Sequence, residues 1–276
     1  MLNSAFSNPP SALFILFLFL THLAIGIAWT LILVPRAAGI KFFRFNAGVV
    51  VALLAVAAAL RPDPAGLSGT WTTGLWLLGV AIAALTLYWA TIGRMLASLR
   101  GLFLWTGLIA GAGALGMQAL ALAPSTDRLG LALTALSFVT SAALLGGACT
   151  AMVLGHWYLI LPSMDIALLK RIVKFHLASL VTRMLIVGVV VLCVIGGLLM
   201  ASVDFSRYAT SVDGVFLWQR VLFGLAGPAV LGWLTWETAK IRSTQSATGI
   251  LYVDFFAVIV GEVLAKYLLM EISLPL

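Results

Sequence analysis

The sequence predicts an all-α integral membrane protein, a bundle of about eight transmembrane helices with both termini on the non-cytoplasmic side. Hydrophobic residues make up 63% of the 276 positions and charged residues only 9%. The mean hydropathy is +1.15. Soluble domains carry about 25% charged residues, so this chain cannot cover a water-facing surface, and lipid must be its main solvent.

Eight apolar runs are long enough, or nearly so, to cross a hydrocarbon core, which takes roughly 20 helical residues. Lipid offers the backbone no hydrogen-bond partner and the runs lack the alternation of barrel strands, so each is expected to be a helix. We predict spans at residues 12–34, 45–60, 74–92, 102–121, 133–159, 180–200, 215–236 and 250–270 of a single transmembrane domain, 1–276. Residues 1–11 contain no Lys or Arg, so a cleaved secretory signal is not expected.

The orientation follows from the Lys and Arg residues in alternate loops. The loops after the first, third, fifth and seventh spans hold ten of them, and the opposite set holds three, Arg61, Arg128 and Arg207. Cytoplasmic loops are enriched in basic residues, so we expect a multi-pass protein of the inner (cytoplasmic) membrane with both ends outside. Because the positive charge sits in short loops between apolar runs, it indicates orientation, and no nucleic-acid partner is expected.

The three histidines are candidates for binding a quinone or a haem. His156 and His176 are expected near the cytoplasmic interface, on neighbouring helices joined by a short loop. Two imidazoles at one depth can clamp a b-type haem or bind a quinone carbonyl, although an interfacial histidine can also simply be hydrated. His22 falls in mid-span, where it needs a hydrogen-bond partner within the bundle. No His, Cys or carboxylate cluster has the spacing of a metal site.

Charged residues inside a membrane are functional candidates because burying a charge in lipid is costly. Arg183 lies seven residues after His176 and shares its helix face. Asp254, Glu262 and Lys266 are spaced by eight and four, again on one face. Glu262, near mid-membrane, can pair with Lys266 at i,i+4 or with Arg183 across helices. Both interpretations stay open, a structural ion pair or a site that handles protons or a quinol head group.

The last two spans resemble the end of the membrane anchor of DMSO-reductase-type and polysulfide-reductase-type enzymes. The matching segments are Trp218-Gln219-Arg220 at the opening of the seventh span, and Gly261-Glu262 followed by Lys266 in the eighth. The resemblance implies a quinol-binding anchor that carries no haem and passes electrons to an iron–sulfur partner on the outer face. It also implies that Arg220, Glu262 and Lys266 belong to the anchor's structural or proton-handling residues.

These observations predict a quinone- or quinol-interacting anchor subunit of a respiratory electron-transfer complex. The chain has neither iron–sulfur cysteines nor a soluble domain, so it would be at most one subunit of an oxidoreductase, with redox subunits as partners and quinone as the cofactor. Two alternatives stay open. The chain could bind b-haem through two of the three histidines, or it could be a small proton-coupled transporter.

Overall fold

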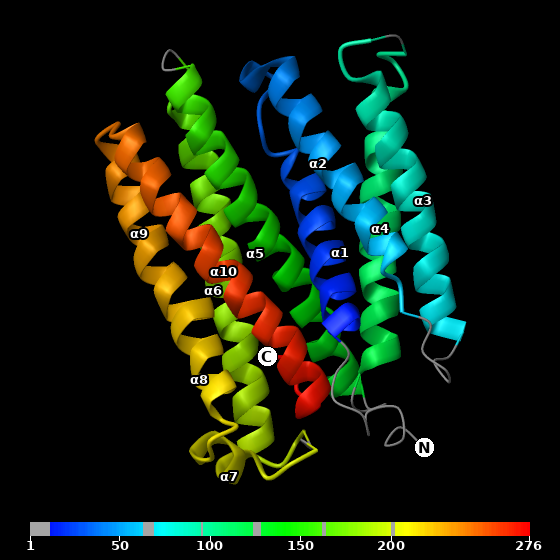
Figure 1. The fold of residues 1–276 in the computed structure, drawn as a ribbon, viewed down its shortest axis with the longest axis vertical. Helices are drawn as coiled ribbons and strands as arrows, with labels where there is room; N and C mark the ends of the chain where they lie inside the picture. Colours follow the sequence, from blue (N-terminus) through cyan, green and yellow to red (C-terminus); the bar gives the residue numbers. More distant parts are fainter. Residues whose placement is uncertain (1–11, 63–68, 95, 124–127, 162–163, 200–201) are drawn as a thin grey trace.

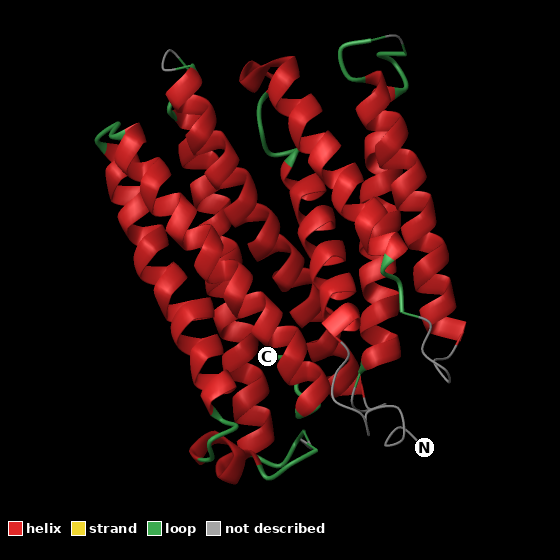
Figure 2. Ribbon diagram, in the orientation of Figure 1, coloured by secondary structure: helices red, strands yellow, loops and turns green. Residues whose placement is uncertain are grey.

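The computed structural model describes residues 12–62, 69–94, 96–123, 128–161, 164–199 and 202–276. These residues form helices and connecting turns, without a strand among them (Figure 2). The helices are α1 (Ala12–Thr30), α2 (Gly39–Ala59), α3 (Gly69–Thr91), α4 (Arg100–Leu122), α5 (Arg128–Ile160), α6 (Ala167–Ile195), α7 (Phe205–Thr210), α8 (Val215–Val221), α9 (Gly227–Lys240) and α10 (Thr244–Glu271).

Eight helical segments in the described residues are long and apolar enough to cross a membrane, which confirms the predicted helical membrane class. Six of them start earlier than predicted, by two to thirteen residues. The second begins at Gly39 rather than at 45, and the sixth at Ala167 rather than at 180. Hydropathy marks only the apolar part of a helix, whereas backbone hydrogen bonds continue through charged turns such as Lys170 to Lys174.

Consecutive long helices run in opposite directions, so the connections alternate between the two ends of the bundle (Figure 1). One end holds the connections α1–α2, α3–α4, α5–α6 and α9–α10. The ten basic residues counted above lie in or beside these connections, and we call this end the basic end. They are Arg36, Lys41, Arg44, Arg94, Arg100, Lys170, Arg171, Lys174, Lys240 and Arg242.

Helix α1 lies at the centre, in contact with α2, α4, α5 and α10, while α3 pairs with α4 at one edge and α6 with α9 at the other (Figure 1). Glycines allow the closest approaches. A Cβ on Gly146 of α5 would lie 2.0 Å from the carbonyl carbon of Gly26 of α1. A Cβ on Gly261 of α10 would lie 2.1 Å from the Cα of Gly224. Main chains therefore touch at both places, as is common where membrane helices pack.

The seventh span is not a continuous α-helix. A π-helical turn, Leu222–Ala226, separates α8 from α9, and Pro228 follows it. Proline has no N–H for the carbonyl four residues earlier, here that of Gly224. Single π turns inside helices frequently mark functional sites, and this one lies beside the charged residues described next.

Candidate functional site

Glu262 of α10 is fully buried, and its carboxylate meets three cations. Its Oε1 lies 3.0 Å from Arg183 Nε of α6 and 3.0 Å from Arg220 Nη2 of α8. Its Oε2 lies 3.1 Å from Lys266 Nζ, one turn further along α10. We call these four residues the ionic cluster. It lies inside the bundle, nearer to the end opposite the basic end.

The ionic cluster is not balanced in charge, because three cations share one carboxylate. Oxygens outside the cluster supply further acceptors. Arg183 Nη1 donates to the main-chain oxygen of Ser137 at 3.1 Å and to its hydroxyl at 2.6 Å, and Nη2 donates to the main-chain oxygen of Leu276 at 2.9 Å. Buried charges are tolerated only when paired and hydrogen-bonded, and these contacts meet that requirement for Arg183.

Arg220 reaches Glu262 because of the broken span. Its Nη1 donates at 3.3 Å to the carbonyl of Gly224, the group that Pro228 cannot serve. The contact between Gly224 and Gly261 brings this segment against α10 next to Glu262. The guanidinium of Arg220 is thus fixed by two features together. One is the carbonyl of Gly224, which Pro228 leaves without its helical donor, and the other is the close contact of Gly224 with Gly261.

Ser141 of α5 links the ionic cluster to His22 of α1. Its hydroxyl donates to Glu262 Oε2 and accepts from Lys266 Nζ at 2.6 Å. His22 Nδ1 lies 3.0 Å from the same hydroxyl. A hydroxyl has one hydrogen to donate, so Nδ1 must be the donor to Ser141. His22 Nε2 is buried without a hydrogen-bond partner among the described residues.

A second buried pair joins α6 and α10, the helices that carry Arg183 and Glu262, nearer the basic end. His176 Nε2 of α6 lies 2.8 Å from Asp254 Oδ2 of α10, and both side chains are fully buried. None of the four polar side-chain atoms of this pair makes a hydrogen bond within the described residues, so the contact is a close electrostatic approach. His176 precedes Arg183 by seven residues and Asp254 precedes Glu262 by eight, so the two acid–base pairs follow one another at about 11 Å along parallel helices.

His156 has a different partner. Its Nδ1 lies 3.1 Å from the hydroxyl of Tyr252, and both side chains are exposed on the outside of the bundle. Tyr252 and Asp254 are two residues apart, which is about 3 Å along α10 and about 200° around it. His156 and His176 therefore approach α10 at similar depth, as predicted, but from opposite sides. The structure does not bring these two imidazoles onto one ligand.

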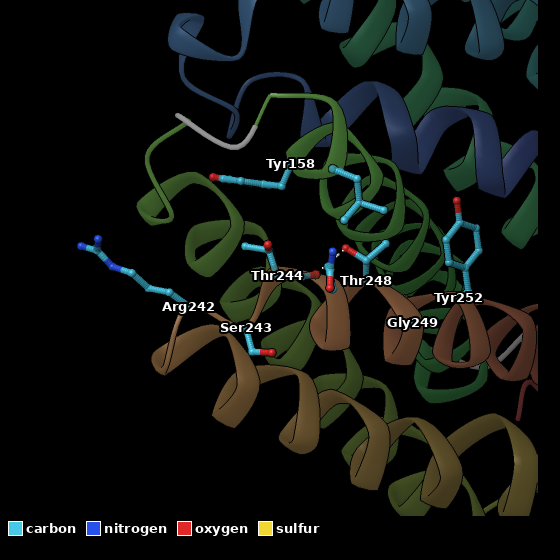
Figure 3. Close-up of a pocket in the computed structure, with 9 residues that line it drawn as sticks. Tyr158, Arg242, Ser243, Thr244, Thr248, Gly249 and Tyr252 are labelled. Carbon is cyan, nitrogen blue, oxygen red and sulfur yellow. Dashed lines mark hydrogen bonds between the residues drawn. The ribbon is translucent and has the colours of Figure 1, made fainter.

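Tyr252, the partner of His156, lines a pocket of about 640 Å³ between the end of α5 and the start of α10, which we call the polar pocket (Figure 3). Tyr158 and Leu159 line it from α5, and Thr248 and Tyr252 line it from α10. The side chain of Arg242 extends away from the two tyrosines in Figure 3. The pocket combines hydroxyl groups with an apolar wall at the depth where the basic end begins.

Of the predicted site residues, the structure brings Arg183, Arg220, Glu262 and Lys266 into one cluster, with His22 attached through Ser141. His176 with Asp254, and His156 with Tyr252, are separate sites. Three residues of these sites are not predicted from the sequence, namely Ser137, Ser141 and Tyr252. Serine and tyrosine are ordinary in membrane helices, and no spacing distinguishes these three.

Within the described residues, no group of three or more His, Cys, Asp or Glu side chains is placed to hold a metal ion. Comparison with family models, curated proteins and solved structures finds no match. The resemblance to DMSO-reductase-type anchors therefore stays a prediction.

Proposed function

We propose that this protein is a membrane subunit that binds quinone or quinol for a respiratory electron-transfer complex, with the head group in the polar pocket. The observation that carries the proposal is Tyr252, which lines a cavity of about 640 Å³ and whose hydroxyl is hydrogen-bonded to His156. Small-molecule sites typically combine apolar walls with a few polar groups. This site has both, on the outside of the bundle, where a lipid-soluble molecule arrives without crossing the protein.

The chemistry of the pair fits the two forms of the ligand. A quinone carbonyl accepts a hydrogen bond, which the hydroxyl of Tyr252 can donate. A quinol gives up two protons with two electrons, and an imidazole is a suitable proton acceptor near neutral pH. His156 is not among the residues that line the pocket, so in this proposal it acts through the hydroxyl of Tyr252, which its Nδ1 contacts.

In this proposal the buried charges hold the helices that build the pocket. The ionic cluster joins α6 and α8 to α10, and Ser141 extends it to α5. His176–Asp254 adds a second contact between α6 and α10. These contacts set the position of α10 relative to α5, and with it the distance between Tyr252 and His156.

The basic end is proposed to face the cytoplasm, which places both termini outside the inner membrane. A redox subunit, with an iron–sulfur cluster or another carrier, would accept or supply the electrons. The resemblance places such a partner on the outer face. The position of the polar pocket at the basic end favours a partner on the cytoplasmic face instead.

The test uses the purified protein, quinone analysis of its lipid extract and titration with a fluorescent hydroxyquinoline N-oxide, a quinol analogue. Tyr252→Phe removes one hydrogen bond, and we expect affinity to fall about threefold to tenfold. Tyr267→Phe is the matched control, because this tyrosine lies on the same helix, in a tilted ring contact with Phe216, and does not line the pocket. Absence of both quinone and analogue binding, or an equal loss in the two variants, would refute the proposal.

A small proton-coupled transporter is the second candidate, favoured by the continuous contacts from His22 through Ser141 to Lys266 and Glu262. It predicts proton-driven solute movement in vesicles that contain this protein alone. The optical spectrum of the same preparation tests for b-haem. A reduced b-type band that His156→Ala or His176→Ala abolishes would support the haem alternative.

A further inference from the structure

A second cavity, of about 660 Å³, opens at the basic end on the other side of the bundle. It lies between the α1–α2 connection and the α3–α4 connection. Arg36 and Arg100 line its polar part. Phe43, Tyr88, Leu104 and Trp105 line its apolar part. The cavity shares no lining residue with the polar pocket, so it is a separate place on the molecule.

The charge around this cavity has one sign only. The two connections carry Arg36, Lys41, Arg44, Arg94 and Arg100. The described residues from α1 to α4 contain no Asp or Glu. Among these described residues nothing acidic neutralises the arginines, and an anion is the complementary ligand.

Arg100 is held in place but has donor capacity left. Its Nη2 donates to the main-chain oxygen of Thr91 at 2.9 Å, which fixes the side chain against the end of α3. Its Nε is buried without a hydrogen-bond partner among the described residues. Arg36 is exposed at the rim. Arginine guanidinium groups that line one cavity are a common way to bind a phosphate.

The rest of the cavity is apolar and favours a ligand that carries a hydrocarbon group as well as a phosphate. Trp105 is 54% exposed, and together with Phe43 and Leu104 it forms an apolar wall that a small inorganic ion would leave uncovered. A ligand that fills both parts has an anionic head and a hydrocarbon tail. Basic pockets between membrane helices bind anionic lipid head groups for this reason.

We propose that this cavity is a binding site for an anionic phospholipid, with the phosphate on Arg36 and Arg100 and an acyl chain along Phe43, Leu104 and Trp105. The lipid joins the α1–α2 and α3–α4 hairpins at their ends. The site is independent of quinone binding, because it lies on other helices and uses none of the residues of the polar pocket.

The experiment measures binding of phosphatidylglycerol to the delipidated, detergent-solubilised protein by native mass spectrometry. Phosphatidylcholine, which is zwitterionic, is the comparison without net charge, and glycerol phosphate is the comparison without acyl chains. Each arginine near a lipid phosphate contributes about fivefold in affinity. Arg36→Gln with Arg100→Gln is therefore expected to weaken phosphatidylglycerol binding about 30-fold. Arg44→Gln with Arg94→Gln is the matched control, since it removes the same charge from the same two connections but outside the cavity.

A second variant keeps the arginines and fills the space. A Cβ on Gly101, which lines the cavity, would meet no atom within 4 Å, so Gly101→Phe is expected to fold and to displace the lipid. Loss of binding in both cavity variants, but not in the control, supports the proposal. It is overturned if phosphatidylcholine binds equally well, if glycerol phosphate competes as strongly as the lipid, or if the control variant loses as much binding.

Discussion

Replacing Glu262 with glutamine removes the anion of the ionic cluster and keeps its shape. The three cations that lie 3.0 to 3.1 Å from the carboxylate then stay buried together without the side-chain anion that they share. Removing one partner of a buried ion pair destabilises a protein by about 3–5 kcal/mol. For a chain of this size, that corresponds to a fall in the melting temperature of roughly 10 °C. We expect Glu262→Gln to show at least this fall when unfolding is followed in detergent.

Two further variants make the measurement decisive. Glu237→Gln removes a carboxylate from an exposed i,i+3 pair with Lys240, and the loss there is expected to be below about 1 kcal/mol. Adding Lys266→Gln to Glu262→Gln removes one unpaired cation, and should restore part of the lost stability. The electrostatic account is refuted if Glu262→Gln is no less stable than Glu237→Gln, or if the double variant is less stable than Glu262→Gln alone.

Two other changes test the packing and the second buried pair. Gly146→Ala forces a methyl group into the main chain of Gly26 and should lower the free energy of unfolding by about 1–3 kcal/mol or more. The control Gly116→Ala, with no atom within 4 Å of its Cβ, should lower it by less than about 0.5 kcal/mol, roughly the effect of a neutral surface change. Equal midpoints of the two variants in thermal unfolding would contradict the contact. Asp254→Asn leaves the buried imidazole of His176 without its carboxylate and should lower the unfolding free energy by about 1–3 kcal/mol; an unchanged denaturation midpoint would show that the pair contributes nothing to stability.

The helices were largely predictable because each needs only local information, a long apolar run. The prediction was wrong where the limits or the continuity of a helix differ from those of the apolar run. Helix α6 begins at Ala167, within a charged segment, and the seventh span contains a π turn. Pro228 signals a break in that span, but the proline alone does not say that Arg220 will bind the freed carbonyl of Gly224.

The ionic cluster was predictable only in part. The contact of Glu262 with Lys266 follows from helix geometry. Arg183 was the other partner that the sequence offered for the buried carboxylate. The helix contacts that bring in Ser141 and Arg220 depend on packing between segments far apart in the chain, and no spacing encodes them. The two histidines at similar depth show the same limit, since depth can be estimated from sequence but the side of a neighbouring helix cannot.

The ionic cluster also bears on how the chain enters the membrane during synthesis. Arg183 precedes Glu262 by 79 residues and Arg220 precedes it by 42, so both arginines are made before their counter-charge exists. An unpaired arginine opposes insertion by about 2.5–3.5 kcal/mol at the centre of a helix. The span of Arg183 has the highest mean hydropathy of the eight, 2.5, while that of Arg220 reaches only 1.4. Helix α6 can therefore enter the membrane alone. In contrast, α8 and α9 are expected to leave the translocon together with α10, as a hairpin that already contains the Arg220–Glu262 ion pair.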